Sequence, residues 1–311
     1  MGIKIGILVV YFAIMVGIGL YCRKHTTDVK GFVLGGRSVG PWLTAFAYGT
    51  SYFSAVVFVG YAGQFGWKYG IASTWIGLGN AIIGSLLAWV ILGRRTRIMT
   101  QHLDSATMPE FFGSRFDSKS LKIGASALIF IFLIPYTASL YNGLSRLFAM
   151  AFDIDFTICV IVMAVLTGIY VIAGGYMATA INDFIQGIIM LFGIVAVIAA
   201  VIHSKGGFMS ALQGLANVSD PAVSDTPGIF ASFLCVVILT SLGTWGLPQM
   251  VQKFYAIDNE ASIQKGTVIS TIFALIVSGG CYFLGGFGRL FSDQIDVKAN
   301  GFDSIIPTML S

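Results

Sequence analysis

The sequence predicts an all-α, polytopic membrane protein with about eight transmembrane helices. Hydrophobic residues make up 56% of the chain, charged residues only 10%, and the mean hydropathy is +0.86. These values lie outside the range of soluble globular domains. Apolar stretches of roughly 18 to 25 residues also recur along the chain, and each is long enough to cross the bilayer core as a helix.

The predicted spans follow one another along the whole sequence, so residues 1–311 are expected to form a single membrane domain. In chain order they cover about residues 3–22, 41–66, 71–93, 124–149, 156–177, 183–203, 228–252 and 267–290. The first span is too long for the apolar core of a signal peptide, and no small-residue cleavage site follows it. The sequence therefore predicts a protein whose main partner is the lipid bilayer.

The basic residues indicate how the spans are oriented, because short cytoplasmic loops retain Lys and Arg. Of the 18 such residues, twelve follow the first, third or seventh span. The twelve are Arg23, Lys24, Lys30, Arg37, Arg94, Arg95, Arg97, Arg115, Lys119, Lys122, Lys253 and Lys265. The other six, which include Lys298, lie on the opposite side. This bias predicts a multi-pass plasma-membrane protein with its N-terminus outside.

Residue spacing argues against an enzyme and against a nucleic-acid partner. The four cysteines are far apart, which fits neither a disulfide framework nor a zinc site, and the three histidines are equally dispersed. Paired carboxylates and an interfacial nucleophile, which a membrane enzyme needs, are not visible in the sequence. A net charge of +4 is too small to indicate nucleic-acid binding.

Polar residues interrupt the second span in its middle. Residues 49–54 read Gly-Thr-Ser-Tyr-Phe-Ser, where lipid-facing leucines would be expected. An unpaired backbone amide or carbonyl in hydrocarbon costs several kcal/mol. A helix can therefore be loosened there only where the freed groups face protein, water or an ion, so this interruption predicts a binding site.

The seventh span carries a second interruption. Residues 240–249 read Thr-Ser-Leu-Gly-Thr-Trp-Gly-Leu-Pro-Gln, which combines hydroxyls, glycines and a proline. The two interrupted spans are five crossings apart and so run through the membrane in opposite directions. An inverted five-helix repeat with a site at the midplane would produce this pattern. The alternative is that small residues merely let helices pack closely.

A third polar segment connects the fifth and sixth spans. Residues 174–186 read Gly-Gly-Tyr-Met-Ala-Thr-Ala-Ile-Asn-Asp-Phe-Ile-Gln. In one interpretation Asn182 or Asp183 is the N-cap of the sixth span, favoured by the helix dipole. In the other, Asp183 is an acidic station at the inner mouth of a cation pathway. The residues alone leave both interpretations open.

Four motifs resemble those of the sodium:solute symporters, a family of carriers for proline, pantothenate, sugars and sialic acid. They are Leu-Gly-Gly-Arg-Ser-x-Gly at 34–40, Met-Pro-Glu-Phe-Phe-x-x-Arg-Phe at 108–116, Gly-Gly…Ala-x-x-x-x-Asp-x-x-Gln at 174–186 and Trp-Gly-x-Pro-Gln at 245–249. The resemblance implies a LeuT-like fold of about thirteen helices around two inverted repeats. This chain would hold a lead helix (3–22), the first repeat (41–203) and the start of the second (228–290), without the C-terminal helices.

The resemblance also implies a sodium ion as the coupling ion. The backbone carbonyls of Thr50 and Phe53 would coordinate it with Ser54 close by, since oxygen ligands suit a hard cation. Asp183 matches the aspartate that family members use on the sodium route. The family completes this site with a Ser/Thr pair that corresponds to positions beyond Ser311, so the site in this chain would be partial.

Solute contacts are expected on the other faces of the same interruptions. The residues expected there are Ser51, Tyr52, Tyr136, Thr240, Ser241, Thr244 and Trp245. For Tyr136, core packing is an equal alternative. Proline carriers have an acidic residue where Tyr52 stands and aromatic residues near Thr240 and Thr244. The turns at 68–70 and 246–248 look closer to those of pantothenate-type carriers.

The resulting prediction is a sodium-coupled secondary active symporter that imports a small organic solute, with carboxylates such as pantothenate or proline as candidates. An ion channel would also place polar backbone at the midplane, but it usually needs subunit symmetry around a pore. A truncated, non-transporting membrane bundle is the remaining alternative.

Overall fold

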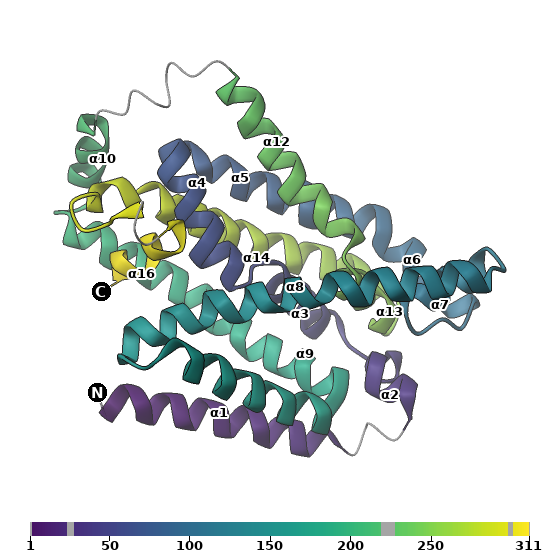
Figure 1. Cartoon of the computed structure of the whole chain (residues 1–311). Coiled ribbons are helices and arrows are strands. Elements are labelled where there is room, and N and C mark those ends of the chain that lie inside the picture. Colours follow the sequence, from purple (N-terminus) through teal and green to yellow (C-terminus); the bar gives the residue numbers. More distant parts are fainter. Residues whose placement is uncertain (1, 24–27, 219–227, 298–300, 311) are drawn as a thin grey trace. The chain divides into compact units, whose positions relative to one another are not determined.

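A computed structural model describes residues 2–23, 28–218, 228–297 and 301–310 (Figure 1). Helices and their connections make up these residues, and the one bridge between extended segments joins Val39 and Ile257. The prediction of an all-α chain is thus confirmed for the described part. Lys24 and Lys298, two of the basic residues used to predict the orientation, lie outside it.

The chain forms two compact units, each drawn from three stretches of sequence. The first unit comprises Met1–Ser51, Ala88–Gly187 and Gly246–Ser270, and the second unit comprises Tyr52–Leu87, Ile188–Trp245 and Thr271–Ser311. Both predicted interruptions therefore coincide with places where the chain passes from one unit to the other.

Most helices of the first unit lie wholly within it. They are α1 (Gly2–Cys22), α2 (Val29–Leu34), η2 (Gly35–Arg37), η6 (Trp89–Gly93), α6 (Arg94–His102), α7 (Met108–Arg115), α8 (Lys119–Phe152) and α13 (Pro248–Ala256). Three others, α3 (Pro41–Tyr52), α9 (Phe156–Ser204) and α14 (Glu260–Gly286), begin in this unit and end in the second.

The second unit contains shorter helices. They are η3 (Val56–Tyr61), α4 (Ala62–Tyr69), η4 (Gly70–Ser73), α5 (Thr74–Gly79), η5 (Asn80–Leu87), α10 (Phe208–Asn217), α12 (Ile229–Leu242), η7 (Gly243–Gly246, whose last residue belongs to the first unit), η8 (Gly288–Phe291), η9 (Phe302–Ser304) and α16 (Ile305–Leu310). Two of them, η3 and η5, are π-helical, a geometry that is frequent at functional sites.

Six described helical stretches are long and apolar enough to cross a membrane. Two of them, Val56–His102 and Phe156–Ser204, have 47 and 49 residues, about twice the roughly 20 residues that one crossing needs. Inside the second, Gly175 adopts φ 56° and ψ −149°, a conformation that only glycine takes readily. The helix direction changes there, so this stretch accounts for the fifth and sixth predicted spans.

Both predicted interruptions are present. Helix α3 ends at Tyr52 and η3 begins at Val56, while the Ser54 carbonyl accepts hydrogen bonds from the backbone N–H groups of Val57 (3.0 Å) and Phe58 (3.1 Å). In the seventh span, α12 ends at Leu242 and α13 starts with Pro248. Proline suits this position, because a backbone N–H in the first turn of a helix would have no partner within the helix.

Glycines allow two helices of the second unit to meet backbone to backbone. A Cβ added at Gly66 would lie 2.1 Å from the carbonyl carbon of Gly285, and one added at Gly285 would lie 1.9 Å from the carbonyl oxygen of Ala62. Any larger residue would separate α4 from α14. Close packing by small residues is therefore real in this chain, alongside the interruptions.

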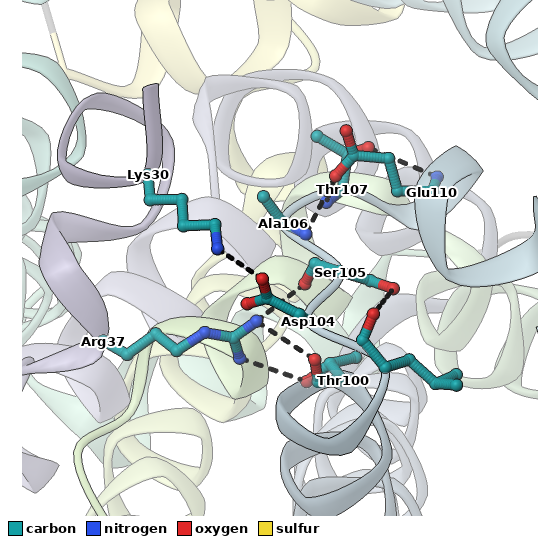
Figure 2. Close-up of polar contacts among 9 residues, drawn as sticks. Lys30, Arg37, Thr100, Asp104, Ser105, Ala106, Thr107 and Glu110 are labelled. Atoms are coloured by element: carbon teal, nitrogen blue, oxygen red, sulfur yellow. Dashed lines mark hydrogen bonds and ion pairs between the residues drawn. The ribbon is translucent and has the colours of Figure 1, made fainter. Parts of the chain in front are cut away.

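In the first unit, Arg37 ties three segments together. Its guanidinium donates hydrogen bonds to the carbonyls of Thr100 (3.1 Å) and Ser105 (2.8 Å), shown in Figure 2. A third hydrogen bond, of 3.3 Å, goes to the carbonyl of Tyr255. Arg37 itself has φ 55° and follows Gly35 and Gly36, which also have positive φ. Since non-glycine residues rarely adopt this conformation, the guanidinium contacts must offset the strain.

Two of the four motifs that carry the family resemblance, 34–40 and 108–116, pack against α13 beside this arginine. Leu34, Ala106, Val251 and Tyr255 form a buried cluster, against which Val33, Met108 and Phe111 pack. Glu110 completes a capping box with Thr107 at the start of α7. The motifs thus build one packed region of the first unit, which positions α13.

Candidate solute and ion sites

Tyr52 joins the two interruptions within the second unit. Its hydroxyl donates a 2.7 Å hydrogen bond to the carbonyl of Thr240, 188 positions away, and faces the hydroxyls of Ser241 and Thr244. The ring is buried and stacks on Phe53, with 4.3 Å between ring centroids. Four residues expected from the sequence to contact solute therefore lie together.

Asn80 anchors the same hydroxyls, although the sequence analysis did not identify it. Its side-chain oxygen accepts hydrogen bonds from Thr240 Oγ1 (2.9 Å) and Ser241 Oγ (3.0 Å). The residue is 1% exposed. The available signal was an asparagine inside an otherwise apolar span, which in a membrane needs internal partners.

Trp245 completes this group, which we call the neutral cluster: Tyr52, Asn80, Thr240, Ser241, Thr244 and Trp245. The indole Nε1 donates a 3.0 Å hydrogen bond to the carbonyl of Ile83, in the π-helical η5. A π-helix leaves carbonyls differently placed from those of an α-helix, and here one of them holds the tryptophan. The cluster contains polar groups but no formal charge.

Gly84 provides the space for the phenol of Tyr52. A Cβ at this position would lie 2.1 Å from the Tyr52 hydroxyl oxygen and 2.7 Å from the nearest ring carbon. Contacts this short do not occur, so the tyrosine could not keep its place beside an alanine. Gly84 and Tyr52 are therefore sterically matched.

The remaining two expected solute residues belong to the first unit and are not part of the neutral cluster. Ser51 lies near the end of α3, directly before the unit boundary. Tyr136 lies on α8 next to Pro135, and its carbonyl accepts a 2.7 Å hydrogen bond from Ser139. Their role remains a prediction.

The interruption at 50–54 contains the two carbonyls that the sequence analysis assigned to sodium, those of Thr50 and Phe53. Among the described backbone hydrogen bonds beyond the regular helices, none ends on the carbonyl of Thr50 or of Phe53. The Thr50 hydroxyl, in contrast, donates to the Phe46 carbonyl at 2.9 Å. The role of the two carbonyls as cation ligands remains a prediction.

Asp183 lies inside α9 and has helical residues on both sides. The N-cap interpretation of Asn182 or Asp183 is therefore wrong, because the turn between the fifth and sixth spans is confined to Gly175. In the first unit the Asp183 carboxylate pairs with the ammonium of Lys253 at 3.5 Å and also interacts with Thr50. The ammonium of Lys253 lies 5.1 Å from the ring centroid of Tyr176.

We call Thr50, Tyr176, Asp183 and Lys253 the charged cluster. The side chains of Lys253 and Asp183 are only 8% and 22% exposed. Next to Asp183 in sequence, the Asn182 amide is buried with neither end hydrogen-bonded among the described residues. Carboxylate and amide oxygens are ligands of hard cations. Within the described chain, no group of three or more His, Cys, Asp or Glu side chains suits a transition metal.

Interrupted helices with polar clusters in an apolar bundle are typical of membrane transport proteins. The sequence pattern of the sodium:solute symporter family matches residues 32–300. The chain belongs to this family. Osmoregulated proline transporter OpuE of Bacillus subtilis is 30% identical to it over 291 residues, which cover 93% of this chain and 59% of the relative.

Other comparisons agree. The sodium/proline symporter of Escherichia coli is 30% identical over 291 residues, covering 92% of this chain and 57% of the relative. A solved structure of a Na+-coupled sialic acid symporter in its substrate-bound, outward-open state aligns with a TM-score of 0.79 at 19% identity, over 99% of this chain and 65% of that one. The fold is therefore LeuT-like, as expected, and the chain spans less than two thirds of these relatives.

Proposed function

We propose that this chain acts in sodium-coupled symport of a small organic solute across the plasma membrane, with its N-terminus outside. The observation that carries the proposal is the hydrogen bond from Tyr52, at one interruption, to the Thr240 carbonyl at the other. A polar cluster built from two interrupted helices is the arrangement that transporters of this kind use to bind solute. Membership of a symporter family supports the same conclusion.

For sodium, the proposed ligands are the carbonyls of Thr50 and Phe53 with Ser54 nearby, and Asp183 is the acidic station on its route. Neutral oxygens hold the ion without a permanent charge in the membrane. The pairing of Asp183 with Lys253 supplies a cation for the carboxylate when no sodium is there. Sodium passing Asp183 would then compete with the ammonium for the same oxygens.

Solute binding is assigned to the neutral cluster, with Ser51 and Tyr136 as further candidates. Relatives named for proline make L-proline the first solute to test. Tyr52 stands where proline carriers have an acidic residue, so pantothenate is the second. The polar groups of this cluster can bind a solute through hydrogen bonds. We propose that the chain takes part in transport and does not act as an enzyme.

Uptake into proteoliposomes that contain the full-length protein tests the proposal. Proline, pantothenate, a monocarboxylate and a sugar are each supplied with an inward sodium gradient and with a matched potassium gradient. Symport predicts uptake of at least one solute only with sodium, and reciprocal enhancement of sodium and solute binding. Uptake that is equal in both gradients would contradict it, and a sodium current without solute would favour a channel.

A further inference from the structure

The side-chain amide of Asn80 is only half used by the neutral cluster. Its oxygen accepts hydrogen bonds from the hydroxyls of Thr240 and Ser241, whereas its nitrogen is buried without a hydrogen-bond partner among the described residues. Leaving a buried donor unpaired costs about 1–3 kcal/mol. Native structures rarely keep such a group unless water, an ion or a ligand meets it.

A second unused polar group lies beside it. The hydroxyl of Tyr282, on α14 in the second unit, is also buried without a hydrogen-bond partner among the described residues, and the residue is 0% exposed. This hydroxyl faces the Asn80 side chain, with which it interacts without meeting full hydrogen-bond geometry, and it also neighbours the Tyr52 hydroxyl. The two unused groups therefore adjoin the same part of the neutral cluster.

The helices that carry these two groups are held in fixed contact. Ser73 Oγ donates a 2.9 Å hydrogen bond to the Tyr282 carbonyl. One turn further along α5, a Cβ at Gly77 would lie 2.7 Å from the Ser278 carbonyl oxygen. These contacts hold the helical stretch that leads into Asn80 against the part of α14 that carries Tyr282.

We propose that Asn80 Nδ2 and the Tyr282 hydroxyl form a subsite for a carboxylate oxygen of the transported solute. The assignment rests on the proposed symport function. An amide nitrogen can only donate, a phenol can donate, and a carboxylate only accepts. Hydrogen bonds to a charged acceptor are about twice as strong as neutral ones. Thr240 and Ser241 act as positioning residues, since they hold the amide oxygen and so turn the nitrogen toward the subsite.

Two substitutions test the subsite in sodium-driven uptake by the full-length protein, with L-proline, pantothenate and glucose as probes. Tyr282→Phe removes only the hydroxyl and is expected to raise KM for the carboxylate probes about tenfold with kcat nearly unchanged. Asn80→Asp keeps an acceptor for Thr240 and Ser241 but opposes the solute with a like charge. It is expected to lower kcat/KM about a hundredfold for the carboxylate probes.

Tyr69→Phe is the matched control. Tyr69 is another buried tyrosine of the second unit, 6% exposed, and its hydroxyl contacts Ser232 Oγ at 3.3 Å. Its loss should leave the KM of each probe unchanged. Thermal unfolding in detergent checks that each variant is folded. If Asn80→Asp does not fold, Tyr282→Phe alone tests the subsite.

The outcomes separate the subsite from the transport function. An active wild type whose KM is unchanged by Tyr282→Phe would overturn the subsite and leave symport intact. Sodium-driven uptake of glucose but of neither carboxylate would do the same. A wild type without sodium-dependent uptake of any probe would overturn symport and, with it, the subsite.

Discussion

The charged cluster of the first unit and the neutral cluster of the second use opposite means to keep polar groups in an apolar bundle. Asp183 and Lys253 neutralise each other across 3.5 Å, whereas Tyr52, Asn80 and Thr240 rely on hydrogen bonds of 2.7 to 2.9 Å without any charge. A charged pair can exchange its cation for another, and a neutral network can accept a solute without stored charge. Under the proposed function, we expect the charged cluster to act on the ion and the neutral cluster to bind the solute.

The largest expected effect is on the charged cluster. Asp183→Asn leaves the 8%-exposed Lys253 without its partner, and breaking such a buried pair costs about 3–5 kcal/mol. Thermal unfolding of the purified protein in detergent measures this loss. The double variant Asp183→Asn/Lys253→Met should regain most of the stability while its sodium affinity stays low. A single variant as stable as wild type would show that the two groups do not depend on each other.

The next effect concerns the proposed sodium carbonyls. Thr50→Pro should lower the free energy of unfolding by about 3 kcal/mol, because proline in a helix interior removes a hydrogen bond and clashes with the carbonyl four residues earlier. The resulting distortion of the helix should also lower sodium affinity. Thr50→Val removes a hydroxyl that already bonds to Phe46 in its own helix, so it should lower sodium affinity far less. Sodium titration of both variants compares them. Equal losses would make the hydroxyl, not the carbonyl, the important group.

A smaller effect is expected in the neutral cluster. Gly84→Ala places a methyl group 2.1 Å from the Tyr52 hydroxyl, and overpacking of this kind costs about 1–3 kcal/mol. Displacing the phenol should also weaken solute binding without altering the sodium affinity of the charged cluster. Gly279→Ala is the control, since its Cβ would meet nothing within 4 Å. Sodium and solute affinities that fall together would remove the division between the clusters.

The smallest effect calibrates the comparison with a surface ion pair. Lys30 and Asp104 are closer, at 2.6 Å, than Asp183 and Lys253, but they are 50% and 73% exposed. Because water screens them, Lys30→Ala should leave the free energy of unfolding nearly unchanged. Thermal unfolding checks this expectation. A loss as large as that of Asp183→Asn would mean that distance, rather than burial, determines the strength of these pairs.

The interruptions were predictable because glycine, proline and hydroxyl residues are conspicuous in apolar spans. Tyr52, Thr240, Ser241 and Trp245 were accordingly identified in advance and lie together. Asn80 was not, since a lone asparagine in a span has no local pattern that reveals its partners, which come from residues about 160 positions away.

The turn before the sixth span shows the opposite kind of failure. Polar residues at 182 and 183 suggested a helix start, since Asn and Asp favour caps. The change of helix direction is confined to Gly175. Asp183 therefore lies within α9, and its carboxylate pairs with Lys253. That partner, 70 positions along the chain, could not be deduced from local sequence.

The steric match between Gly84 and Tyr52 has an evolutionary consequence. A relative with a short acidic side chain at position 52 would leave the space beside residue 84 empty, and a void of that size is unfavourable. The two positions should therefore covary among symporters of this family: glycine at 84 where 52 is tyrosine, and a larger residue where 52 is acidic. Covariation of this pair across many relatives would then serve as a marker of which solute each carrier takes.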